Sequence, residues 1–153
     1  MNIKKVSTNF DSLSPIILDM LNRNLDVMIM VNGTSMNPML KHKRDKVVLT
    51  SCDKFNLKKG DIPLYRRSNG KYVLHRIVKV NEDSYDFCGD NQYEIERDVP
   101  KTAVIAVAKG FERNGKMYGC NDMMYGLYWR FWMLSRPFRR IIHHVRFRLR
   151  RKK

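Results

Sequence analysis

Two Asn-Gly pairs constrain the fold of this chain more than any other feature of its sequence. Asn69-Gly70 separates two short apolar runs, and Asn114-Gly115 separates two more. The pair favours the tight turn of a β-hairpin, because both of its residues accept positive φ angles. The flanking runs are rich in β-branched and aromatic residues, which is typical of strands; they cover 64–66, 72–78, 104–111 and 116–118. The sequence therefore predicts an antiparallel β domain from about residue 62 onward.

A helix and two further strands are predicted ahead of this region. Ser14 followed by Pro15 suits the start of a helix, because serine caps the first turn and proline is tolerated at the first helical position. The runs 27–31 and 46–50 are apolar with β-branched members and predict strands. The first of these strands should end at Asn32-Gly33.

The end of the chain holds most of its positive charge. The chain has 30 Lys and Arg against 15 Asp and Glu, a net charge of +15. Ten of the basic residues and none of the acidic ones lie in 125–153, so residues 1–124 keep 20 basic and 15 acidic groups, a net of +5. Apolar residues there recur every three or four positions, as in an amphipathic helix; they are Leu127, Phe131, Leu134, Phe138, Ile141 or Ile142, Val145 and Leu149.

We therefore expect one mainly β domain in residues 1–124 and a basic amphipathic helical tail in residues 125–153. The tail suits an anionic membrane surface, because arginine attracts acidic headgroups and aromatic side chains favour the interface. Its aromatic residues include Tyr125, Tyr128, Trp129, Phe131, Trp132 and Phe138. Two alternatives stay open: the helix packs on its own domain, or it binds nucleic acid.

Composition also bears on compartment and cofactors. Three cysteines, none of them in a Cys-x-x-Cys spacing, suit free thiols in a reducing compartment. No apolar run approaches the roughly 20 residues that span a bilayer, and no secretory signal is expected. These features predict a cytoplasmic protein, with peripheral attachment at the inner face of the membrane as a further hypothesis. No metal or cofactor is expected, since the adjacent His143 and His144 would face different sides of a helix.

The segment 31–40 is a candidate site. It joins the end of a predicted strand to a proline-bearing turn, from which Ser35 can project beside backbone amide donors. His75, in the apolar run 72–78, is a second candidate. Taken singly, each has an ordinary structural explanation, as a turn serine and a hydrogen-bonded core histidine.

Four short motifs, in the same order along the chain, resemble the boxes of type I signal peptidases. Gly-Thr-Ser-Met-Asn-Pro-Met-Leu at 33–40 is similar to the nucleophile box Gly-x-Ser-Met-x-Pro-Thr-Leu, with Met39 in place of threonine. The others are Gly-Asp-Ile-Pro-Leu-Tyr at 60–65, Leu-His-Arg-Ile-Val at 74–78 and Gly-Asp-Asn at 89–91. His75-Arg76 resembles the histidine-base branch typical of the endoplasmic reticulum and archaea. The resemblance covers about residues 26–110 and implies membership of the superfamily that also holds LexA-like repressors.

The resemblance implies a role for each matched residue. Ser35 would be the nucleophile and His75 the general base, because a serine hydroxyl attacks only when a neighbouring base takes its proton. Asp90 would orient the imidazole, with Glu96 as the alternative acid. The amide of Ser35, helped by a donor near Gly33, would form the oxyanion hole. Oxyanion and substrate contacts are implied for Gly33, Thr34, Met36 and Pro38.

The implied activity is that of a serine endopeptidase that processes a peptide or precursor protein. Signal peptidases carry a membrane-spanning helix before the nucleophile box, whereas a short helix is predicted here, so cleavage of exported preproteins across the membrane is not expected. Two other classes stay open. One is a catalytically silent binding module that keeps the signal-peptidase-like fold. The other is a basic nucleic-acid-binding protein, which the tail alone would suggest.

Overall fold

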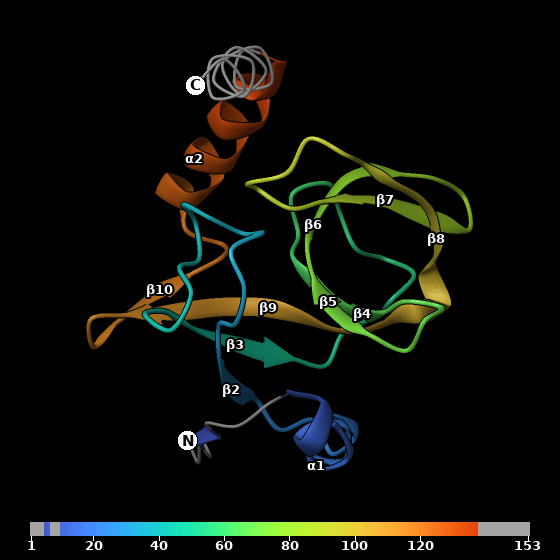
Figure 1. Ribbon diagram of the computed structural model, residues 1–153, viewed down its shortest axis with the longest axis vertical. Helices are drawn as coiled ribbons and strands as arrows, with labels where there is room; N and C mark the ends of the chain where they lie inside the picture. The colour runs from blue at the N-terminus through green and yellow to red at the C-terminus, as the bar shows by residue number, and fades with distance from the viewer. Residues whose placement is uncertain (1–4, 7–9, 138–153) are drawn as a thin grey trace, which may run out of the picture.

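The computed structural model describes residues 5–6 and 10–137 and is mainly antiparallel β, with a helix near each end, as the sequence predicts (Figure 1). Its elements are β1 (Lys5–Val6), α1 (Phe10–Asn22), β2 (Val27–Met30), β3 (Lys46–Thr50), β4 (Pro63–Arg66), β5 (Tyr72–Leu74), β6 (Arg76–Val80), β7 (Ser84–Cys88), β8 (Glu96–Pro100), η1 (Lys101–Ala103), β9 (Val104–Arg113), β10 (Lys116–Gly119) and α2 (Met123–Leu134). Residues 138–153 of the tail predicted for 125–153, including Phe138, lie outside the described residues.

Two sheets build the domain. The larger one has the strand order β1-β2-β3-β9-β4-β5, and β10 pairs with the far end of the long strand β9. The smaller one has the order β6-β7-β8. Among the described residues, all strand pairs are antiparallel except β1 with β2. The larger sheet curls, so that β2 and β5 come to lie across one cavity from each other (Figure 1).

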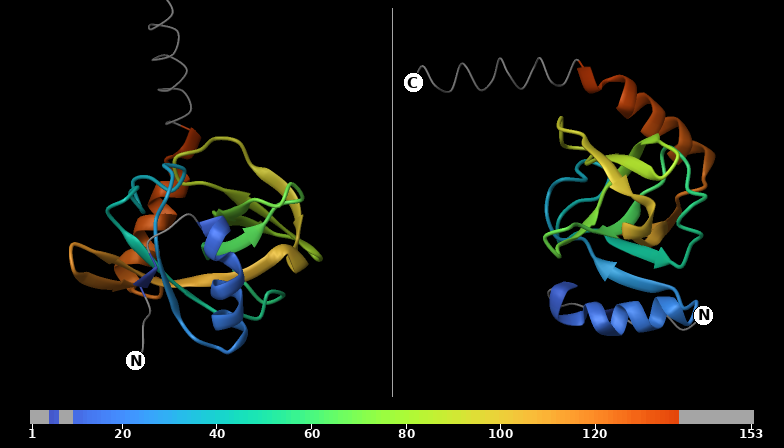
Figure 2. Two further views of the ribbon diagram at one scale, coloured as in Figure 1. Left: turned by 60° about the horizontal axis from the view of Figure 1, so that its bottom comes forward. Right: turned by 90° about the vertical axis from the view of Figure 1, so that its right-hand side faces the viewer.

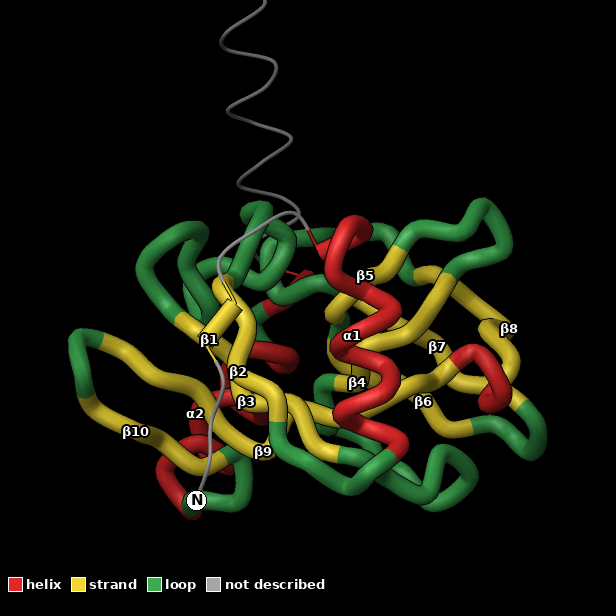
Figure 3. Tube along the Cα trace, turned by 90° about the horizontal axis from the view of Figure 1, so that it is seen from below, coloured by secondary structure: helices red, strands yellow, loops and turns green. Residues whose placement is uncertain are grey.

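The core consists of two apolar clusters. In the first, Ile17 and Leu21 of α1 pack with buried residues of the larger sheet, among them Val27 and Leu49. Figure 3 shows α1 crossing this sheet. The second cluster lies against the smaller sheet and contains Tyr65, Ile77, Tyr85, Phe87, Val99 and Val104. Burial of these apolar surfaces supplies the main driving force for folding.

The N-terminal helix is longer than the sequence predicts. It begins at Phe10 rather than at Ser14, and Pro15 lies inside it. A proline inside a helix removes one backbone hydrogen bond. The helix is nevertheless kept, because its apolar side packs on the sheet through Ile17 and Leu21, and tertiary packing is the main source of helix stability in proteins.

The predicted strand 72–78 is in fact two strands. Residues 72–74 form β5 in the larger sheet, and residues 76–80 form β6 in the smaller one. His75 is the single residue between them, at the point where the chain crosses from one sheet to the other. Its neighbour Arg76 pairs with Cys88 in the smaller sheet, whereas Leu74 pairs with Leu64 in the larger one.

Helix α2 packs on the domain with one of its sides. Trp129 lies against Gly60, where an added Cβ would come within 2.5 Å of the indole. Trp132 donates its indole N–H to the carbonyl of Asp90, at 2.8 Å. For residues 123–134 the structure therefore agrees with the alternative that the helix packs on its own domain. In the described ranges, no helix is long and apolar enough to cross a bilayer.

Candidate active site

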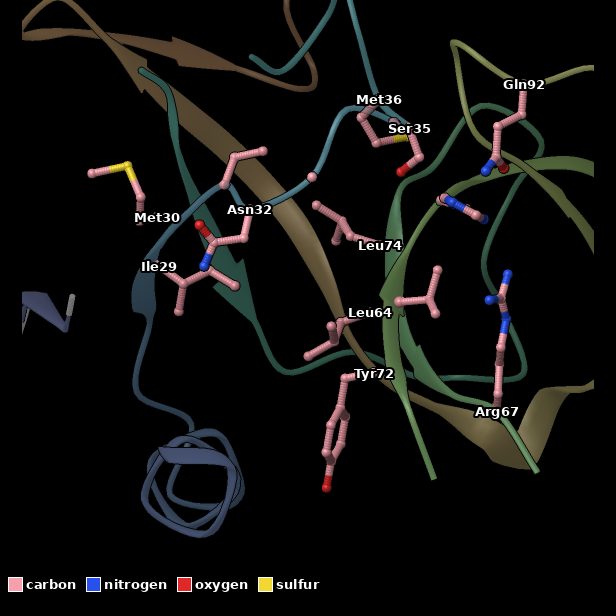
Figure 4. Close-up of a pocket in the computed structure, with 14 residues that line it drawn as sticks. Ile29, Met30, Asn32, Ser35, Met36, Leu64, Arg67, Tyr72, Leu74 and Gln92 are labelled. Carbon is pink, nitrogen blue, oxygen red and sulfur yellow. The ribbon is translucent and has the colours of Figure 1, made fainter. Parts of the chain in front are cut away.

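Ser35 and His75 line the same cavity, which has a volume of about 390 Å³. Figure 4 shows Ile29 and Asn32 on one side of it and Leu64, Tyr72 and Leu74 on the other. The first two come from β2 and the residues after it, the other three from β4 and β5. The cavity lining mixes apolar side chains with polar ones, and it brings together the Ser35 hydroxyl and the His75 imidazole, although these two residues are 40 positions apart.

Ser35 sits in the turn that follows β2 and is partly exposed. Its hydroxyl makes no hydrogen bond to any residue that the structure describes. The turn begins at Gly33, whose φ of 95° lies in the region that favours glycine. Backbone geometry therefore presents the hydroxyl to the cavity without engaging it elsewhere.

The Gly-Asp-Asn motif at 89–91 holds this turn. The amide N–H of Asn91 donates to the carbonyl of Ser35 at 2.8 Å, and the Asn91 side chain donates to the carbonyl of Thr34 at 3.3 Å. Gly89 approaches so closely that an added Cβ would lie 2.6 Å from the Ser35 carbonyl oxygen. Glycine is required there by contact with the backbone beside the candidate nucleophile.

The carboxylate of Asp90 is bound by Arg76. Its two oxygens accept hydrogen bonds of 2.8 and 2.6 Å from the guanidinium, and both side chains are fully buried. Arg76 also donates to the carbonyl of Gly60 and to the hydroxyl of Tyr125 on α2. Burial alone would lower the pKa of Arg76, but the bonded Asp90 raises it well above its usual value. Asp90 is thus part of a fully buried ion pair that joins β6, the turn at Ser35 and α2.

Glu96 is connected to His75 through Tyr65. The Tyr65 hydroxyl lies 3.3 Å from Nδ1 of His75 and donates to the Glu96 carboxylate at 2.7 Å. Arg67 donates to both oxygens of that carboxylate, at 2.6 to 3.0 Å. Sequence reasoning named Glu96 as the alternative acid but missed Tyr65 and Arg67. The sequence feature that could have pointed to Tyr65 is its place at the end of the motif at 60–65.

The charges along this chain of contacts follow from burial and hydrogen bonding. Burial lowers the pKa of His75 to about 4; the charge of Arg67 acts in the same direction, and that of Glu96 opposes it. Burial, with the hydrogen bond to Glu96, raises the pKa of Tyr65 far above its usual value. Burial acts to raise the pKa of Glu96, but hydrogen bonds from Arg67 and Tyr65 hold it below its usual value. At neutral pH the imidazole is neutral, the phenol protonated and the carboxylate charged.

These protonation states determine the tautomer of His75. The single proton of the Tyr65 hydroxyl points to Glu96, so the phenol oxygen can only accept a hydrogen bond from the imidazole. The proton of the neutral ring is then on Nδ1. Nε2 carries the free lone pair, which is the form that a general base requires.

The candidate oxyanion donors are backbone amides of the turn at Ser35. The N–H groups of Ser35 and Met36 donate to no other residue in the described part of the chain. Gly33 differs, because its N–H donates to Nδ1 of His42 at 3.0 Å. Gly33 and Met36 line the cavity, Thr34 binds the Gly-Asp-Asn turn through its carbonyl, and Pro38 is exposed.

Across the described residues, His, Cys, Asp and Glu form no group of three or more that could hold a metal ion. A scan against protein-family models and a search of curated proteins each find no match to this chain. The likeness to signal peptidases accordingly rests on the four sequence motifs.

Proposed function

We propose that this chain is a serine endopeptidase of signal-peptidase type, with Ser35 as nucleophile and His75 as general base. One observation supports this above all. The cavity that contains the unengaged Ser35 hydroxyl also contains a buried, neutral imidazole whose Nδ1 is taken up by Tyr65. A merely structural histidine has no need to keep Nε2 free in a cavity that a serine hydroxyl also lines.

In the proposed reaction, Nε2 of His75 takes the proton of the Ser35 hydroxyl as its oxygen attacks the scissile carbonyl carbon. The Ser35 and Met36 amides stabilise the resulting oxyanion. Collapse breaks the C–N bond, and the proton on Nε2 passes to the departing amine. Water, deprotonated in turn by His75, then hydrolyses the acyl-enzyme and releases Ser35.

Glu96 is our preferred third member, acting through Tyr65. As His75 becomes positively charged, its Nδ1–H bonds the phenol oxygen, whose own proton is held by the Glu96 carboxylate. This chain of two hydrogen bonds would fix the tautomer and stabilise the cation, as a directly bonded carboxylate does in other serine peptidases. Asp90, the other candidate acid, is engaged by Arg76 and would instead support the nucleophile turn through Asn91.

The substrate proposed is an extended peptide or precursor segment lying between β2 and β5. Extended peptides bind by main-chain hydrogen bonds to strand edges, with pockets for alternate side chains. The apolar part of the lining, which includes Ile29, Leu64 and Leu74, suits an apolar side chain near the cut. The family resemblance further implies small residues at the cut itself. It also implies that the substrate is a signal peptide or a precursor protein that is processed by the cut.

We place this activity in the cytoplasm, with the protein peripheral at the inner face of the membrane. Free thiols at Cys52, Cys88 and Cys120 suit a reducing compartment. The basic C-terminal sequence suits the anionic inner leaflet.

The decisive test is a fluorophosphonate probe, which reacts with activated serines, followed by peptide mapping in a mass spectrometer. We expect one adduct, on Ser35, and its loss in Ser35→Ala and in His75→Ala. Ser68→Ala is the matched control, because Ser68 is exposed in a hairpin turn away from the cavity. The peptidase proposal would be contradicted if wild-type Ser35 formed no adduct. If peptides still bound the cavity in that case, the chain would be a catalytically silent binding module.

A further inference from the structure

Helix α2 is apolar on two opposite sides. Tyr125, Trp129 and Trp132 face the domain, where they contact Arg76, Gly60 and Asp90. The other side points away from the domain and carries large apolar side chains that are between 55 % and 79 % exposed. These five residues form what we call the outward face: Met123, Met124, Leu127, Phe131 and Leu134.

The outward face is a continuous stripe. At 3.6 residues per turn, its five members fall within an arc of roughly 100° around the helix axis. Figures 1 and 2 show α2 at the end of the molecule opposite to α1, with its outer side away from the sheets. From the sequence, a membrane surface was one of three roles considered for the aromatic residues of this region. Of the five that the structure describes, Phe131 alone lies on the outward face.

The charge around the stripe restricts the kind of partner that it can bind. Arg130 is exposed on α2, and residues 125–153 hold ten basic residues and no acidic one. Two copies meeting through this face would bring two such strongly positive segments together, which opposes self-association. A partner therefore has to accept apolar side chains and supply negative charge. Exposed methionine and leucine have no use in binding phosphate backbones, whereas a bilayer with acidic headgroups supplies both requirements.

We propose that the outward face of α2 docks onto bilayers that carry anionic headgroups. The five side chains enter the boundary between headgroups and acyl chains, and the neighbouring basic residues contact the acidic headgroups. The inner aromatic side of α2 stays on the domain, so docking requires no unfolding of the site. This proposal deepens the peripheral location proposed above and does not depend on the peptidase chemistry.

The test is co-sedimentation of the full chain with vesicles of phosphatidylcholine alone or mixed with phosphatidylglycerol. We expect binding to the mixed vesicles only, weakening with added salt because salt screens the charges. The double variant Phe131→Ser, Leu134→Ser should lower the partition coefficient by about tenfold or more, as it removes two large apolar groups from the interface.

The matched control is Phe55→Ser, Met117→Ser, which removes two similarly exposed apolar side chains outside α2. We expect it to bind as the wild type does, and both variants to keep the wild-type melting temperature. Equal loss in both double variants, or none in the α2 variant, would overturn the proposal. So would sedimentation equilibrium showing a dimer that the α2 variant alone disperses, or binding of RNA in preference to the mixed vesicles.

Discussion

His75 and Arg76 are adjacent in the sequence, yet they belong to two polar clusters of different character. His75 borders the cavity and connects through Tyr65 to the pair Glu96–Arg67, whose side chains are 29 % and 34 % exposed. Arg76 points into the domain and binds Asp90, and both side chains are 0 % exposed. The two clusters use the same chemistry, a guanidinium bonded to a carboxylate, in different dielectric surroundings.

The difference in burial separates their expected roles. Removing one partner from a buried ion pair leaves an uncompensated charge and costs about 3–5 kcal/mol. A partly exposed pair contributes about 0–1 kcal/mol, since water screens it. The Arg76–Asp90 pair should therefore matter for stability, and the Arg67–Glu96 pair for the state of His75.

The largest expected effect comes from neutralising the carboxylate of each pair in turn. Asp90→Asn should lower the free energy of unfolding by about 3–5 kcal/mol. Glu96→Gln should change it by about 1 kcal/mol or less and lower kcat/KM by about 10²- to 10³-fold, because the carboxylate behind Tyr65 is lost. Urea unfolding and peptide hydrolysis measure the two quantities.

A double variant sharpens this comparison. Arg76→Met with Asp90→Leu removes both charges together, so it should be more stable than Asp90→Asn alone. Should Asp90→Asn unfold normally yet lose turnover as Ser35→Ala does, Asp90 rather than Glu96 would be the catalytic acid.

Tyr65→Phe should have the next largest effect. Without the hydroxyl, Nδ1–H of His75 loses its acceptor and Glu96 loses its link to the ring. We expect kcat/KM to fall by about 10- to 100-fold, within the range that a positioned proton-transfer group contributes. Tyr85→Phe is the control, since its hydroxyl bonds the Leu57–Lys54 loop outside the cavity. Equal loss of activity in both variants would show a general effect on the core.

The smallest expected effect is a shift in the pH profile. A protonated imidazole cannot take the serine proton, so kcat/KM rises with pH as His75 loses its proton, with a midpoint near about 4. An ordinary histidine would give a midpoint near about 6.5. Arg67→Gln should move the midpoint upward, because the positive charge of Arg67 disfavours a second positive charge on the ring. A wild-type rise confined to about pH 8.5 and above would point to a lysine base.

Much of the fold could be predicted because the signals are local. The strand 46–50 and the hairpins at Asn69-Gly70 and Asn114-Gly115 follow from apolar runs and turn preferences in a few neighbouring residues. β8 was missed, since Glu-Arg-Asp-Val-Pro at 96–100 is largely charged and half exposed and so lacks the apolar pattern of a strand.

For the site, the motifs alone selected Ser35 and His75, and the structure places both in one cavity. They could not distinguish the partners of Asp90 and Glu96, because these partners come from other strands and no local spacing reports on them. The division of 72–78 into two strands at His75 could not be predicted for the same reason. The two halves of this apolar run pair with strands of different sheets, and no local pattern marks the change.

Periodicity of side chains, turn chemistry and charge are properties of the chain itself, and they determined the β class and the two helices. The candidate nucleophile and base came from the resemblance of four motifs to a known family. Only packing between distant strands decided which carboxylate forms the buried ion pair with Arg76 and which is joined to His75 through Tyr65. Both sides of α2 are apolar, so its sequence could not say which side is buried. Contact with Gly60 and Asp90 decided that, because only the inner side carries indole rings, one of which fills the space beside Gly60 while the other donates its N–H to the Asp90 carbonyl.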